Sequence, residues 1–132
     1  MAVRVTIFDD NKRLLDSLSV LIDGSPGFQM AGIFENCNNL ISDIERTQPD
    51  VILMDIEMPV VNGLQGVKLV KKQYPQIKII MQTAFDDDDK IFKSLAAGAD
   101  GYLLKSTSPT KLYEAIKDVV LGSAPMSPGI AR

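Results

Sequence analysis

The chain has 132 residues, a formal charge of −3 at pH 7 and no histidine. Its length fits one domain with its own hydrophobic core, and 45% hydrophobic against 23% charged residues is typical of globular rather than disordered proteins. The negative charge argues against nucleic-acid binding by this segment alone, and the lack of histidine excludes a Ser-His-Asp triad.

The single cysteine and the apolar pattern indicate the compartment. Cys37 has no second cysteine to pair with, which agrees with a reducing environment, and no histidine exists to activate it. We therefore expect Cys37 to be a packing residue. No apolar run approaches the roughly 20 residues that span a bilayer, and the N-terminus lacks a signal-peptide pattern. We expect a cytoplasmic protein that does not bind membranes.

Short apolar runs alternate with helical patterns along the chain. Short apolar runs predict strands at Val3–Phe8, Phe28–Phe34, Val51–Met54, Ile77–Met81 and Gly101–Leu104. The run Phe28–Phe34 is more mixed than the others, which favours an edge position. Apolar residues three or four positions apart predict helices at Asn11–Asp23, Asn38–Thr47, Leu64–Gln73, Asp86–Ala97 and Pro109–Leu121. This alternation predicts an α/β fold with helices on both faces of a parallel sheet.

Polar residues follow four of the predicted strands. Asp9-Asp10, Asp55, Thr83 and Lys105 each come where an apolar run stops. Ligands of open parallel sheets bind beyond the carboxyl ends of the strands, so we expect these side chains to converge there. Carboxylates about 5 Å apart repel by roughly 3 kcal/mol per pair at an effective dielectric near 20, which favours binding of a divalent cation.

Oxygen ligands without imidazole or thiolate favour Mg²⁺. We expect Asp10 and Asp55 to bind the metal directly and Asp9 to bind it through water. A backbone carbonyl just after Asp55, that of Glu57, would complete the ligand set. Three carboxylates, Mg²⁺ and Lys105 sum to zero charge, and such a pocket suits phosphoryl transfer.

Roles for the remaining residues follow from this chemistry. Asp55 is the expected nucleophile, because a carboxylate can form an acyl phosphate. Lys105 would pair with a phosphoryl oxygen or with Asp55, and the Thr83 hydroxyl would donate to the phosphoryl group. Each feature alone has an ordinary explanation, since acidic pairs often cap helices and lysines are usually solvated. Their joint occurrence at four strand ends favours the functional interpretation.

The chain resembles the receiver domain of bacterial two-component response regulators. The matching motifs run from Val3 to Leu121 and comprise Asp9-Asp10, Asp55 with Met58-Pro59 and Gly63, Thr83-Ala84, and Ala97–Tyr102 leading to Lys105. The resemblance implies a three-layer α/β/α, flavodoxin-like (CheY-like) fold, a doubly wound five-stranded parallel sheet of order 2-1-3-4-5. It implies that a sensor histidine kinase phosphorylates Asp55. It further implies that Thr83 moves and Tyr102 turns inward, changing the face formed by residues 86–121.

Two segments resemble the NarL/LuxR-type regulators, namely Gly101–Pro109 and Ala124–Arg132. That resemblance implies a receiver at residues 1–121, and at residues 122–132 the start of a linker to a helix-turn-helix DNA-binding domain that controls transcription. It also implies a homodimer on phosphorylation. Ser106 replaces the proline that often follows the lysine, which leaves the geometry of the Lys105–Ser106 peptide open. The acidic Glu57 leaves the lifetime of the phosphorylated form open.

Three other functions compete with a phosphoacceptor module that is not a turnover enzyme. One is a receiver-like binding module that acts without phosphorylation. Another is a Mg²⁺-dependent phosphohydrolase, although its Asp-x-Asp signature usually follows the first strand, whereas Asp55-Ile56-Glu57 follows the third. The last is a flavin-binding flavodoxin relative, in which the acidic turn Asp9-Asp10-Asn11 would repel a phosphate without a metal.

Overall fold

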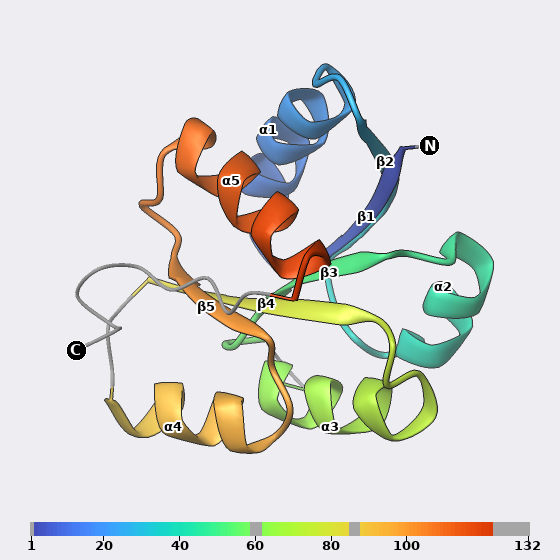
Figure 1. Ribbon diagram of the computed structural model, residues 1–132. Helices are drawn as coiled ribbons and strands as arrows, with labels where there is room; N and C mark the ends of the chain where they lie inside the picture. Colours follow the sequence, from blue (N-terminus) through green and yellow to red (C-terminus); the bar gives the residue numbers. More distant parts are fainter. Residues whose placement is uncertain (1, 59–61, 85–87, 123–132) are drawn as a thin grey trace.

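A computed structural model describes residues 2–58, 62–84 and 88–122. It forms three layers, with a parallel sheet between two sets of helices (Figure 1). Helices α1 and α5 lie on one face of the sheet, and α2, α3 and α4 lie on the other. None of the described helices is long and apolar enough to cross a membrane.

The sheet has the order β2-β1-β3-β4-β5, and all four pairings are parallel. Its strands are β1 Val3–Phe8, β2 Phe28–Phe34, β3 Val51–Asp55, β4 Lys78–Thr83 and β5 Gly101–Leu104. The helices are α1 Lys12–Asp23, α2 Leu40–Thr47, α3 Gly63–Gln73, α4 Asp88–Ala96 and α5 Pro109–Val120. The predicted fold class and strand order are confirmed.

Where the element boundaries differ from the predicted ones, they differ by one or two residues. Strand β4 continues to Thr83 instead of stopping at Met81, because Gln82 and Thr83 still pair with Leu103 and Leu104 of β5. The apolar pattern did not predict this extension, because the residues at the end of the strand are polar. The predicted start of the fourth helix at Asp86 lies outside the described residues.

Alternation along the buried strands builds two hydrophobic cores. In β3, Val51 and Leu53 pack with α1 and α5, whereas Ile52 and Met54 pack on the other face, and all four are fully buried. Cys37 belongs to the second of these cores, where burial raises the pKa of its thiol to about 12. This environment agrees with the expected packing role.

Gly63 sets how closely the start of α3 approaches the end of β3. Its N–H donates to the Ile56 carbonyl at 2.9 Å. A Cβ atom at this position would lie 2.2 Å from the Asp55 carbonyl oxygen and 2.8 Å from Ile56 Cα. Only glycine lets the two backbones approach so closely, and this contact fixes the backbone around Asp55.

We expect Gly63→Ala to lower the free energy of unfolding by about 1–3 kcal/mol, because backbone atoms must move to admit the methyl group. Gly66→Ala is the matched control in the same helix, where the new atom would meet the flexible end of Met54 at 3.1 Å. Alanine favours the helix over glycine by about 1 kcal/mol, which should offset the cost of the contact with Met54. Urea unfolding measures both variants, and equal stability of the two would contradict this reading of Gly63.

Candidate functional site

The carboxyl ends of the strands bring the predicted acidic residues together. Asp9 directly follows β1, Asp55 is the last residue of β3, and they are 1% and 3% exposed. Asp10 is exposed. One carboxylate oxygen from each of Asp9, Asp10 and Asp55 lies within 4.8 Å of the other two. The predicted acidic cluster is therefore present among the described residues.

Lys105 neutralises part of this cluster. Its Nζ lies 3.0 Å from Asp9 Oδ2 and 3.3 Å from Asp55 Oδ2, so one ammonium group contacts both buried carboxylates. The backbone N–H of Lys105 donates to the Thr83 carbonyl at 2.7 Å, which aligns the end of β5 with the end of β4. The described residues contain no cis peptide bond, so the Lys105–Ser106 peptide is trans.

Backbone groups hold the two buried carboxylates in place. Asp9 Oδ1 accepts a hydrogen bond from the Asn11 N–H at 2.9 Å, and Asp55 Oδ1 accepts one from the Glu57 N–H at 3.2 Å. Each bond joins residues two positions apart, in the manner of an Asx turn. The opposite carboxylate oxygens, Oδ2 in both residues, are those that meet Lys105.

The electrostatics of the cluster favour protonation of Asp55. Burial, and after it the nearby Asp9, raise the pKa of Asp55 from 3.8 to about 6. Lys105 and the Glu57 N–H lower it and only partly offset these effects. Burial lowers the pKa of Lys105, but the contacts with Asp9 and Asp55 outweigh burial and raise the pKa above its ordinary value. Lys105 is therefore charged at neutral pH.

Thr83 and Tyr102 lie on neighbouring strands beside this cluster. Thr83 ends β4 opposite Leu104 of β5 and is 2% exposed. Tyr102 is two residues earlier in β5, opposite Met81, and is fully buried in the core that faces α2, α3 and α4. The ring of Tyr102 is thus inside the molecule.

Glu57 contacts a residue that the sequence analysis did not single out. Its exposed carboxylate forms an ion pair with the Lys90 ammonium group of α4. The pair joins the segment that follows β3 to a helix on the same side of the sheet. No pattern links positions 57 and 90 in the sequence, because their proximity depends on how α4 packs. The Glu57 carbonyl remains a predicted metal ligand.

A parallel five-stranded α/β sheet with an acidic cluster and a lysine at its carboxyl edge defines a receiver-type domain. Residues 5–117 match the family model described as "Response regulator receiver domain", and the chain belongs to this family. It is a receiver domain of the NarL/LuxR type.

Curated relatives and a solved structure agree with this assignment. The transcriptional regulatory protein DegU of Brevibacillus brevis is 33% identical over 98% of this chain, and YxjL of Bacillus subtilis is 34% identical over 92%. The chain covers 55% and 56% of their lengths, so it spans about half of these relatives. A LuxR-family response regulator from Aurantimonas has a TM-score of 0.92 at 26% identity, covering 99% of this chain and 94% of its own.

The raised pKa of Asp55 predicts a pH dependence of stability in the absence of metal. Because the folded state binds the Asp55 proton more tightly than the unfolded chain does, the free energy of unfolding should fall as pH rises from about 4 to about 6. A shift from 3.8 to about 6 corresponds to up to about 3 kcal/mol. Asp55→Asn should remove this fall and exceed the wild type in stability at pH 7.

Urea unfolding between pH 4.5 and 7.5 with a chelator measures this difference. Asp16→Asn is the control, because Asp16 is an exposed acid of α1 outside the cluster. The Asp16→Asn variant should show the same pH dependence of the free energy of unfolding as the wild type. An unchanged pH dependence in Asp55→Asn would contradict the assignment of the proton to Asp55.

Proposed function

We propose that Asp55 accepts a phosphoryl group from a phosphohistidine of a sensor histidine kinase. The observation that carries the proposal is the contact of one ammonium group, that of Lys105, with two buried carboxylates beside an exposed third. The Asp55 oxygen would attack phosphorus while the phosphorus–nitrogen bond breaks and its electron pair stays with the leaving imidazole. Lys105 then compensates the negative charge that arrives on the phosphoryl oxygens.

Ionisation of Asp55 is required for this attack. A pKa of about 6 means that most Asp55 side chains are ionised at pH 7 and most are protonated at pH 5. The Glu57 N–H and Lys105 both favour the ionised form, because each donates to or pairs with the carboxylate. Mg²⁺ held by the Asp55 carboxylate would favour the ionised form further.

The acidic cluster fits Mg²⁺. The ligand atoms of Asp9, Asp10 and Asp55 are all hard oxygens within 4.8 Å of one another, and no histidine competes with them. We propose that Asp10 and Asp55 hold the ion directly, Asp9 holds it through water, and the Glu57 carbonyl adds a ligand. When bound, Mg²⁺ would supply positive charge that offsets repulsion between the carboxylates and the phosphoryl oxygens.

The phosphorylated domain would act through a conformational change and not through turnover of a substrate. Thr83 would donate its hydroxyl hydrogen bond to the phosphoryl group, and Tyr102 would be the aromatic residue whose packing changes with it. Both residues are buried, Thr83 on β4, the strand next to that of Asp55, and Tyr102 on β5, one strand further out. The face formed by α4, β5 and α5 would then change, and a homodimer is the expected consequence.

The whole protein would be a transcriptional regulator. Residues 1–121 would be the receiver, and residues 122–132 would begin the linker to a helix-turn-helix domain that binds DNA. The support is the length of the curated relatives, two of which are transcriptional regulatory proteins and extend well beyond the matched region. The place of action would be the cytoplasm, where the kinase domain lies.

Acetyl phosphate, a small-molecule phosphoryl donor, tests the proposal directly. The wild type should give a slower band on a phosphate-affinity gel only when Mg²⁺ is present, and Asp55→Asn should give none. Asp16→Asn, on the exposed side of α1, should behave like the wild type. A folded wild type that shows no shift would reject phosphorylation and favour the phosphorylation-independent binding module.

Mg²⁺ affinity tests the role of the exposed acid. We expect Asp10→Asn to weaken Mg²⁺ binding at least about tenfold, a loss of 1.4 kcal/mol, because the cluster loses one of three carboxylates. Isothermal titration calorimetry measures the affinity, with Asp16→Asn as the matched acid-to-amide change. Equal affinity of the two variants would remove Asp10 from the ligand set.

A further inference from the structure

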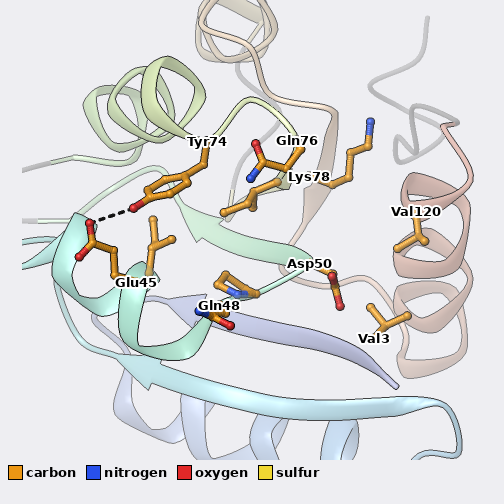
Figure 2. Close-up of a pocket in the computed structure, with 11 residues that line it drawn as sticks. Val3, Glu45, Gln48, Asp50, Tyr74, Gln76, Lys78 and Val120 are labelled. Atoms are coloured by element: carbon orange, nitrogen blue, oxygen red, sulfur yellow. Dashed lines mark hydrogen bonds between the residues drawn. The ribbon is translucent and has the colours of Figure 1, made fainter. Parts of the chain in front are cut away.

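A cavity lies near the amino ends of the strands, away from Asp55. Its volume is about 650 Å³, and its walls come from the end of α2, the α3–β4 connection, the starts of β1 and β4, and Val120 at the end of α5. Figure 2 shows these residues around the opening. Cavities of about 300–1,000 Å³ hold drug-sized ligands, which corresponds to a peptide segment of a few residues.

The acidic groups of this cavity already have partners. The Tyr74 hydroxyl donates to Glu45 Oε1 at 3.0 Å (Figure 2), and Asp50 Oδ2 accepts from the Arg4 N–H at 2.9 Å. The cavity therefore does not present a cluster of free carboxylates to a cation. What remains open to a ligand is the Tyr74 ring and the apolar wall.

Three polar side chains of the cavity are unpaired among the described residues. Gln48, Gln76 and Lys78 line it, and their side chains make no hydrogen bond or ion pair within that part of the chain. Two amides and an ammonium group can donate to carbonyl oxygens, and the amides can also accept from N–H groups. Such a wall suits a peptide backbone, with Ile44, Pro49 and Ile77 providing apolar contacts.

The last described residues of the chain lie beside the cavity. Helix α5 ends at Val120, which lines the cavity and is 42% exposed, and Gly122 follows in a left-handed conformation with φ of 94°. Residues 123–132 lie outside the described residues. They contain the spacing Pro125-Met126-Ser127-Pro128. Segments with this spacing favour the extended polyproline conformation and dock in grooves that contain aromatic rings.

We propose that the Pro125–Pro128 segment of this same chain binds in the cavity, against the Tyr74 ring. Extended chain of this kind advances about 3.1 Å per residue, so Pro125 can lie about 9 Å and Pro128 about 19 Å from Gly122. The docked segment fixes where the chain leaves the domain, on the side away from Asp55. This inference does not depend on the proposed phosphoryl transfer.

Disulfide trapping in the full 132-residue chain tests the docking. Gln76→Cys with Met126→Cys places one thiol at the cavity and one in the segment, with Cys37→Ala to remove the buried thiol. The control pairs Met126→Cys with Asp118→Cys, because Asp118 is exposed on α5, lies outside the cavity, and is only eight positions from Met126. A free segment would reach residue 118 at least as often as residue 76.

We expect the 76–126 disulfide to form at least about tenfold faster than the 118–126 disulfide. Adding Pro125→Ala and Pro128→Ala to the Gln76→Cys, Met126→Cys protein should remove most of this difference in rate. Circular dichroism confirms that each variant is folded. Equal rates, or faster trapping at residue 118, would overturn the proposal. Disulfide-linked dimers as the main product would place the segment of a second copy in the cavity and would also overturn it.

Discussion

The contact of Lys105 with both Asp9 and Asp55 is the interaction on which the functional edge of this domain depends. Two carboxylates that are almost fully buried would be strongly unfavourable side by side without a compensating charge. The lysine provides that charge only because β5, the last strand of the sheet, ends level with β1 and β3. The edge strand is thus tied to the central strands through charge as well as through backbone pairing.

The positive charge of Lys105 does not fully balance the negative charge of the acidic cluster. One ammonium group faces two buried carboxylates and a third at the surface, so Asp55 still has a pKa raised to about 6. A site with excess negative charge favours cations and accepts a phosphoryl group only once further positive charge is bound. The same excess charge that limits stability therefore suits the phosphoryl chemistry proposed for Asp55.

Two ion pairs of different kinds link helices α4 and α3 to opposite ends of the strands. Near the functional edge, Lys90 pairs with Glu57, whose side chain is 52% exposed. At the other edge, Lys71 of α3 contacts Asp100 at 2.7 Å and also donates to the Ile77 carbonyl, while Asp100 accepts from the Ile79 N–H. The side chains of Lys71 and Asp100 are 16% and 24% exposed, against 35% and 52% for Lys90 and Glu57, so solvent screens the Lys71–Asp100 pair less.

Local patterns in the sequence determined the order of elements and the candidates for the site. Short apolar runs placed the strands, and the polar residues after them, Asp9, Asp10, Asp55 and Lys105, were recognisable because parallel strands share one carboxyl edge. Only the tertiary structure decided that Lys105 contacts Asp9 as well as Asp55, the Glu57–Lys90 pair and the close approach of Gly63 to Asp55. These depend on the packing of helices and loops distant in sequence, whereas strand and helix periodicity depend on neighbouring residues alone.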